Sequence, residues 1–462
     1  MFEREVYLKR REGLREILEG GIALFLGNDE SPMNYPANPY RFRQDSNFLY
    51  FFGLDEPGLA AVMDLEEEGM DVIFGNDPDV EDVIWMGPRE PLQARAERVG
   101  VSRTMPYQKL EDYLKGELSR GRTVHFLPPY RGEHLLKLAR FLGIRPEAVK
   151  HWVSSELIKA VVELRSFKGP EEIQQMDMAA TMTAEMHLRA MKNARPGMYE
   201  RELAGEIEGL AISLGGYISF PVILTVHGEI LHNHYHGNML REGQLLLVDA
   251  GAESPLHYAG DMTRTFPVSA RFTTKQREIY EVVLAAQKKA LENIEPGVYY
   301  RDVHLLAAKT MAEGLKALGL MKGDVEEAVA AGAHALFFPH GLGHMIGLDV
   351  HDMEGLGEDY VGYDETVKRS DQFGLAYLRL AKKLQEGFTL TVEPGIYFIP
   401  ALIEKWRSEG KHREFINYDK LEEYLDFGGI RIEDSVVVTE DGCRILGKPV
   451  PKEPEEVEAL RG

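Results

Sequence analysis

The chain has 462 residues, of which 44% are hydrophobic and 28% are charged, and its formal net charge is −22. This length predicts two or three domains, with two as the first expectation, and the composition argues against a disordered or fibrous protein. So acidic a chain would be repelled by a phosphate backbone, so we expect no nucleic-acid partner. No segment approaches the roughly 20 consecutive apolar residues of a membrane helix, so we expect no membrane span.

Cysteine usage points to a reducing environment. Cys443 is the single cysteine, which excludes an intrachain disulfide. Residues 1–5 are not followed by an apolar stretch of signal-peptide length. We therefore expect a cytoplasmic protein.

Short apolar segments bounded by turn residues predict strands in the first 150 or so residues. They cover residues 22–26, 59–63, 71–74 and 123–127, and a helical pattern covers residues 5–18. Strands that alternate with helices predict an α/β domain. A junction follows at residues 166–170, where Pro170 suits the first position of a helix.

The second part of the chain contains a faint internal repeat. Residues 195–199 and 295–299 share a Pro-Gly-x-Tyr pattern, and each opens a helical stretch. Each half then leads to an apolar strand that ends in a carboxylate, Asp249 in the first half and Glu393 in the second. Two similar halves folded face to face would bring these acids together at the centre, although chance similarity stays an alternative.

Two aspartates in the first half could share one face of a sheet. Asp249 ends a strand that looks buried, and a buried charge is costly unless a cation or hydrogen-bond donors meet it. Asp261 precedes residues 262–266, an alternating segment that could return antiparallel to that strand. For this pair alone, the alternative is a turn with an ion pair between Asp261 and Arg264.

Three histidines and three glycines fall within residues 338–352, so imidazoles stand on a backbone that can approach a ligand closely. Acidic residues follow in residues 392–397 and 429–434. The candidate metal ligands are Asp249, Asp261, His344, Glu393 and Glu433. This set has too many carboxylates for a structural zinc site and suits two harder divalent ions bridged by acids.

Residues 248–433 resemble the metallopeptidase family with the pita-bread fold, which includes methionine aminopeptidase, aminopeptidase P, prolidase and the metal-free creatinase. All five ligand positions match in type and order. Residues 340–352 resemble the proline-specific branch, and residues 40–57 resemble the leading domain of aminopeptidase P and prolidase. The resemblance implies an α+β protein with an N-terminal α/β domain over residues 1–165 and a catalytic pita-bread domain over residues 166–462.

The resemblance also implies an activity, an Xaa-Pro aminopeptidase that acts on peptides with proline at the second position. It places Asp249 on one metal and His344 with Glu393 on the other, while Asp261 and Glu433 bridge. The expected cofactors are two divalent ions, manganese first, with cobalt or zinc as alternatives. Glu393 or Glu433 would carry the proton.

Further residues have expected roles around the metals. The resemblance makes His232, His340 and His351 substrate-binding groups, and His232 and His351 would also stabilise the developing oxyanion or the proline carbonyl. Arg431 lies two residues before Glu433 on a predicted strand and would orient a carboxylate, with Tyr397 as its companion. His234 and His236 are expected on the surface.

Several alternatives stay open. Xaa-Pro dipeptidase, or prolidase, is the first, since residues 85–87 and 399–424 are similar to that branch. A non-enzymatic binding module and creatinase-like hydrolysis without metal are disfavoured because all five ligand positions are filled. The family also implies a homodimer or homotetramer.

Overall fold

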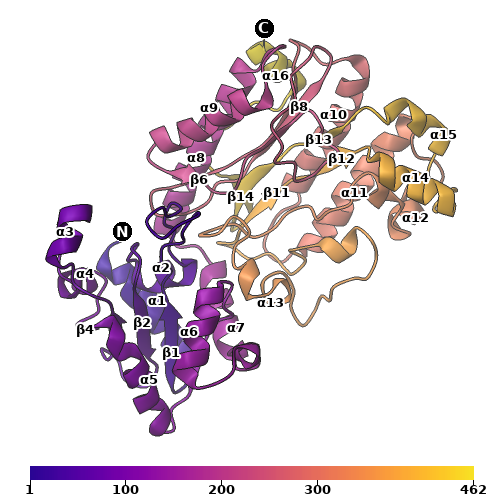
Figure 1. Cartoon of the computed structure of the whole chain (residues 1–462). Helices are drawn as coiled ribbons and strands as arrows, with labels where there is room; N and C mark the ends of the chain where they lie inside the picture. Colours follow the sequence, from indigo (N-terminus) through magenta and orange to yellow (C-terminus); the bar gives the residue numbers. More distant parts are fainter. Residues whose placement is uncertain (462) are drawn as a thin grey trace. The chain divides into compact units, whose positions relative to one another are not determined.

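The computed structural model describes residues 1–461 and divides into two compact units, Met1–Arg165 and the residues from Ser166 onward. In Figure 1 the first unit runs from indigo to magenta and the second from magenta to yellow. Within residues 1–461, no helix is both long enough and apolar enough to cross a membrane.

The first unit is built on a five-stranded sheet in the order β4-β3-β2-β1-β5. Its strands are β1 (Ile22–Leu26), β2 (Ala60–Asp64), β3 (Val72–Phe74), β4 (Arg103–Met105) and β5 (Val124–Phe126). Strand β1 pairs antiparallel with β2 and parallel with β5. The four predicted strands are confirmed to within about two residues; β4 was not predicted, because its three half-buried residues carry no apolar run.

Helices complete the first unit. They are α1 (Arg4–Ile17), α2 (Ser46–Phe52), α3 (Val80–Met86), α4 (Leu92–Arg98), α5 (Leu110–Ser119), α6 (Gly132–Leu142) and α7 (Ser155–Ser166), with short 3-10 helices at Tyr107–Lys109 and Pro146–His151. Apolar side chains of α5 and α6, such as Leu114 and Leu138, pack on the sheet in one core with Ile22 and Val62. This amphipathic packing explains why the alternating pattern folds as an α/β layer.

The second unit has two similar halves. The first contains α8 (Pro170–Asn193), α9 (Glu200–Ser213) and a sheet of β7 (Ile223–Thr225), β8 (Leu245–Asp249) and β10 (Thr263–Pro267). The second contains α10 (Thr274–Leu291), α11 (Tyr300–Ala317) and a sheet of β11 (Thr389–Val392), β14 (Asp434–Thr439) and β15 (Gly442–Ile445). Each half thus sets two long helices beside a three-stranded antiparallel sheet (Figure 1).

The predicted repeat is confirmed down to the backbone. Tyr199 and Tyr299 are the extended residues that precede α9 and α11. Two residues before each tyrosine, Gly197 and Gly297 both have φ 91°, a left-handed conformation that favours glycine. The shared Pro-Gly-x-Tyr pattern therefore encodes the same turn into a helix twice.

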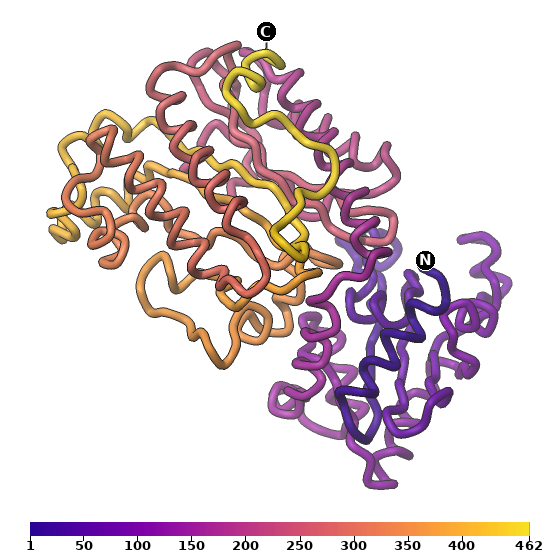
Figure 2. The backbone as a smooth tube through the Cα atoms, turned by 180° about the vertical axis from the view of Figure 1, so that it is seen from behind, coloured from indigo at the N-terminus to yellow at the C-terminus, as the bar shows by residue number. Residues whose placement is uncertain are grey.

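Smaller elements connect and cover the halves. They are β6 (Tyr217–Ile218), β9 (Ala252–Glu253), β12 (Gly395–Tyr397), β13 (Gly429–Arg431), α12 (Val325–Ala330), α13 (Glu358–Gly362), α14 (Pro400–Glu409), α15 (Tyr418–Leu421) and α16 (Pro454–Arg461), with 3-10 helices at Ala333–Leu336, Glu354–Leu356, Leu375–Tyr377 and Glu422–Tyr424. Figure 2 shows the yellow C-terminal segment from behind, where α16 packs beside α8 and α10.

Contacts between β10 of the first half and the segment that links β13 to β14 in the second half join the two halves of the second unit. Thr263 forms a bridge with Glu433, and Arg264 donates through Nη1 to the Glu433 carbonyl oxygen over 2.6 Å. Arg264 also forms a buried ion pair with Asp434, with 2.6 Å between Nη2 and Oδ1. These contacts bring the ends of β8 and β13 to the same place, which is where the candidate site lies.

Candidate metal centre

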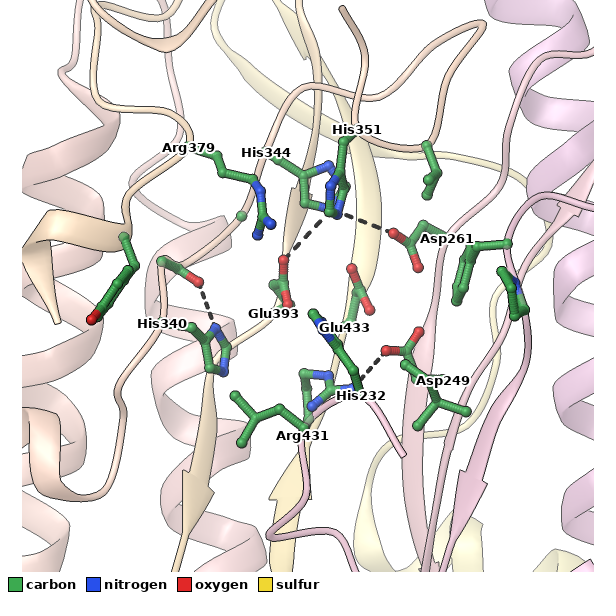
Figure 3. A pocket seen from close by; sticks show the side chains of 18 of the residues that line it. His232, Asp249, Asp261, His340, His344, His351, Arg379, Glu393, Arg431 and Glu433 are labelled. Carbon is green, nitrogen blue, oxygen red and sulfur yellow. Dashed lines mark hydrogen bonds and ion pairs between the residues drawn. The ribbon is translucent and has the colours of Figure 1, made fainter. Parts of the chain in front are cut away.

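Two carboxylates of the site come from the first half. Asp249 is the last residue of β8 and pairs in register with Thr263 of β10, as the antiparallel return predicted. Asp261 lies two residues before that strand, and both carboxylates line one pocket (Figure 3). The alternative ion pair of Asp261 with Arg264 is replaced by the pair between Arg264 and Asp434.

His344 is held by a loop that lies against β11. Its backbone N–H donates to Thr391 Oγ1 over 3.1 Å, and its carbonyl accepts from the Thr391 N–H over 3.0 Å. At Gly343 a Cβ would collide with the Thr391 carbonyl oxygen, so only glycine permits this approach. The spacing of glycines and histidines that stood out in the sequence therefore reflects close backbone pairing.

The hydrogen bonds of His344 fix which nitrogen faces the acids. Nδ1 donates to the Met345 carbonyl oxygen over 2.9 Å, so Nε2 carries the lone pair. Nε2 lies 3.4 Å from Asp261 Oδ2 and 3.6 Å from Glu393 Oε1 (Figure 3). Such a nitrogen, directed at carboxylates, is suited to ligate a cation.

The two glutamates are oriented by threonines. Thr263 Oγ1 donates to Glu433 Oε2 over 2.7 Å, and Thr391 Oγ1 lies 3.5 Å from Glu393 Oε1. One ligand atom each from Asp261, His344 and Glu433 lies within 4.8 Å of the others. The site thus has a compact core of ligating atoms.

The buried carboxylates of the cluster would be stabilised by a bound cation. Burial, together with neighbouring carboxylates, raises the pKa of Asp261, Glu393 and Glu433 well above the ordinary range. Oδ1 of Asp249 and Oδ1 of Asp261 are buried without a hydrogen-bond partner. Buried carboxylates are costly unless they are paired or coordinate a metal, so these residues fit a divalent ion.

A chain of hydrogen bonds runs from Asp249 to His340. Arg431 donates through Nη2 to Asp249 Oδ2 over 2.6 Å and through Nη1 to the Tyr397 hydroxyl over 2.8 Å. The Tyr397 hydroxyl in turn lies 2.9 Å from His340 Nε2, while His340 Nδ1 donates to the Gly341 carbonyl oxygen. Burial lowers the pKa of His340 to about 3, so its ring is neutral and Nε2 accepts from Tyr397.

The cluster lines a pocket of about 260 Å³ in the second unit. His232, His340 and His351 line the same pocket, together with Arg379 (Figure 3). The apolar part of the wall is formed by Phe220, Pro221, Ile223, Leu231, Val350 and Tyr377. The structure therefore brings every ligand and substrate-binding residue expected from the sequence into one cavity.

Some residues differ from expectation or were not predicted. His234, expected on the surface, is exposed but also lines the pocket, and half-buried His236 donates through Nε2 to the Val222 carbonyl oxygen. Thr263, Thr391 and Arg379 were not singled out. Local sequence offers no signal for them, because their roles depend on which distant segments meet.

Comparisons with known proteins agree with this geometry. The model of metallopeptidase family M24 matches residues 174–440, and that of the aminopeptidase P N-terminal domain matches residues 7–125. An Xaa-Pro aminopeptidase of Escherichia coli is 34% identical over 99% of this chain and 97% of its own length. A human Xaa-Pro dipeptidase is 33% identical over 95% of this chain and 88% of its own.

Solved structures are similar over the whole chain. Zinc-substituted E. coli aminopeptidase P in complex with product has a TM-score of 0.82 at 33% identity, and the match covers 100% of this chain and 98% of that one. The same enzyme with the inhibitor Pro-Leu gives 0.80, with the same identity and coverage.

The chain therefore belongs to metallopeptidase family M24, within the group that holds aminopeptidase P and prolidase. The fold class predicted from the sequence, an α/β N-terminal domain with a pita-bread catalytic domain, is confirmed. So is the class of enzyme, a peptidase that depends on a divalent metal.

Proposed function

We propose that this chain is an Xaa-Pro aminopeptidase, which hydrolyses the bond between an N-terminal residue and a following proline. The convergence of acids and His344 in one pocket is the observation that carries the proposal. The E. coli Xaa-Pro aminopeptidase, similar over nearly the full length of both chains, supports it.

The proposed site holds two divalent ions. Asp249 would hold one ion, His344 and Glu393 the other, and Asp261 with Glu433 would lie between them. When bound, such ions act as Lewis acids and make a water molecule acidic enough to ionise near neutral pH. Four carboxylates and one imidazole favour a hard ion, and we propose manganese, with cobalt or zinc as substitutes.

The chain's own residues would hold the peptide and move its protons. Glu393 is the proposed proton carrier, because its carboxylate lies in the cluster and lines the pocket that would receive the peptide. His232 and His351, which line the pocket, are proposed to stabilise the oxyanion that develops on the scissile carbonyl. Arg431 and Tyr397 would keep Asp249 and His340 in their observed orientations.

The preference for proline has a physical basis. The bond before proline is a tertiary amide without an N–H group, so a site that must bind this hydrogen would reject it. Apolar side chains such as Phe220, Ile223 and Leu231 instead offer a wall on which a pyrrolidine ring can pack.

Xaa-Pro dipeptidase is the second candidate. One feature favours it: Arg379 lines the pocket, and a guanidinium there could pair with the C-terminal carboxylate of a dipeptide. A panel of Ala-Pro, Ala-Pro-Ala and longer peptides separates the two functions. An aminopeptidase cleaves the tripeptide and longer peptides, whereas a dipeptidase cleaves Ala-Pro alone.

The test of the proposed function combines metal content with turnover. The chelated protein is reloaded with manganese, cobalt or zinc, and ions per chain are counted by mass spectrometry. His344→Ala and Glu433→Ala should lower both the metal content and the cleavage of Ala-Pro-Ala. His151→Ala and Glu292→Ala, at exposed positions, serve as controls. Full turnover in either site variant would refute the assignment.

We further propose a cytoplasmic homodimer or homotetramer. The exposed apolar side chains of α3, including Ile84 at 71% and Trp85 at 76% exposure, support self-association because such surfaces are commonly covered in oligomers. Light scattering during size-exclusion chromatography measures the mass, and fractionation of the source cells tests the location.

A further inference from the structure

Glu354 lies next to the pocket and contacts two of the side chains that line it. Its Oε2 is 2.5 Å from His351 Nδ1 and 3.2 Å from Arg379 Nε. His351 and Arg379 both line the main pocket (Figure 3), while Glu354 lines a small adjoining cavity. One carboxylate oxygen therefore joins an imidazole and a guanidinium on the wall of the pocket.

A tight turn brings Glu354 back onto His351. The Glu354 N–H donates to the His351 carbonyl oxygen over 3.2 Å, and the next turn is closed by the Leu356 N–H and the Met353 carbonyl oxygen over 2.8 Å. Met353, between them, has φ 61°, a left-handed conformation that is strained for a residue other than glycine. The backbone conformation of this turn thus places the side chains of Glu354 and His351 next to each other.

Arg379 is held at the backbone as well as at the side chain. The neighbouring Ala381 N–H donates to the Gly362 carbonyl oxygen over 2.8 Å. At Gly362 a Cβ would collide with the Arg379 carbonyl oxygen, so α13 packs directly against this segment. Glu358 of α13 adds a longer contact, 3.6 Å from Oε1 to Arg379 Nε. The carboxylates then set the direction of the guanidinium.

The hydrogen bond between Glu354 and His351 has a chemical consequence. An ionised carboxylate only accepts hydrogen bonds, so His351 Nδ1 must carry the hydrogen. Nε2 is then the nitrogen left for a peptide in the pocket, and the ring cannot turn without losing its partner. Because the same oxygen accepts from Arg379, a displacement of Glu354 disturbs both groups at once.

We propose that Glu354 is a positioning residue of the peptide-binding pocket, whose Oε2 sets the tautomer of His351 and fixes the Arg379 guanidinium beside it. The proposal rests on the proposed function, because the effect of Glu354 reaches the peptide through these two groups. Glu354 thereby holds the His351 imidazole and the Arg379 guanidinium in fixed orientations on one wall of the cavity.

The first test is Glu354→Gln in the metal-loaded protein. Glutamine has the same size, but its amide group can donate to His351 Nδ1 and so permit the other tautomer, and it has no charge to hold Arg379. We expect kcat/KM for Ala-Pro-Ala to fall by about tenfold or more, as for other groups that orient a ligand. Metal content and melting temperature should match the wild type.

Glu358→Gln is the matched control. Glu358, which lines the small adjoining cavity, pairs with Arg379 and Arg369, and the bond between Glu354 and His351 stays intact in this variant. Its loss of kcat/KM should be clearly smaller than that of Glu354→Gln. Equal losses would overturn the part of the proposal that concerns His351.

A double-mutant cycle tests whether Glu354 acts through His351. In a His351→Ala background, Glu354→Gln should have an effect at least threefold smaller than in the wild type, because the ring it positions is gone. Independent, multiplicative losses would contradict the proposal, and so would a Glu354→Gln enzyme with wild-type kcat/KM.

A crystal structure of metal-loaded Glu354→Gln distinguishes this inference from the proposed function. A rotated His351 ring or a displaced Arg379 guanidinium supports the positioning role, even if the wild type proves to cleave another class of peptide. Unchanged positions of both side chains, together with a wild-type kcat/KM, overturn it. Failure of the wild type to cleave any Xaa-Pro peptide, by contrast, counts against the proposed function.

Discussion

Arg431 Nη2 lies 2.6 Å from Oδ2 of Asp249, a residue 182 positions earlier in the chain. The same guanidinium donates through Nη1 to Tyr397 and through Nε to Thr263 Oγ1, so its plane is fixed on three sides. Asp249 is consequently held by one oxygen, and its Oδ1 has no hydrogen-bond partner. The orientation of a candidate ligand is thus set before any cation arrives.

This relationship predicts a large effect for Arg431→Lys. An ammonium group cannot reproduce three fixed N–H contacts, so Asp249 should lose its orientation. We expect metal affinity and kcat/KM to fall by about 10- to 100-fold, the range typical of groups that orient metal ligands. Metal titration and turnover measure this. Arg444→Lys, at the exposed pair with Asp177, should change neither, and wild-type affinity in Arg431→Lys would contradict the prediction.

Metal removal should make stability depend on pH. The pKa values of Asp261, Glu393 and Glu433 are raised in the folded, metal-free protein, first by burial and then by neighbouring carboxylates. Above the unfolded-state pKa of about 4, the folded protein therefore binds more protons than the unfolded chain, and its stability falls as pH rises.

A bound cation keeps the carboxylates ionised in the folded protein and so prevents this fall in stability at higher pH. The difference in melting temperature between metal-loaded and chelated protein should therefore grow from pH 5 to pH 8. Scanning calorimetry of both forms at several pH values measures it. Glu433→Gln, which removes one titrating group, should weaken the pH dependence of the chelated form. If the difference in melting temperature instead shrinks toward pH 8, the pKa values of these carboxylates are not raised in the metal-free protein.

Gly343→Ala should disrupt the site without touching any ligand. Its methyl group would collide with the Thr391 carbonyl oxygen, so the loop that carries His344 must move away from β11. We expect loss of metal and of peptide cleavage, while circular dichroism stays close to the wild type. Gly355→Ala, where a Cβ would meet open space, should keep both metal and activity. Full metal content in Gly343→Ala would contradict this account of the loop.

The buried ion pair of Lys168 and Asp352 should matter for folding. The two groups are 2.9 Å apart, and each side chain is 1% exposed. Lys168→Met removes the cation and leaves the Asp352 charge in the interior, which typically costs about 3 kcal/mol or more. Urea unfolding of the metal-loaded protein measures the change.

Lys448→Met is the control for this ion pair. Its partner Glu185 is 41% exposed, and exposed pairs contribute at most about 1 kcal/mol. Equal free energies of unfolding for the two variants would contradict the prediction that the buried ion pair contributes more to stability than the exposed one.

The sequence alone was sufficient to predict five candidate metal ligands and to identify the repeat. Asp249, Asp261, His344, Glu393 and Glu433 stand in recognisable local motifs, because metal chemistry requires particular side chains at particular places. The two Pro-Gly-x-Tyr turns were likewise readable, because a left-handed glycine before a helix is a local backbone requirement.

Only the tertiary structure decided which groups orient those ligands. Thr263 reaches Glu433, and Glu354 joins His351 to Arg379, and no local pattern marks these choices. The position of Arg431 predicted that it would orient a carboxylate, but only the fold shows that this carboxylate is Asp249. Many polar residues could orient a site residue by a hydrogen bond. Which residue does so depends on which distant segments of the chain pack together. Chemistry is therefore encoded in short motifs, whereas the orientation of its groups is a property of the assembled fold.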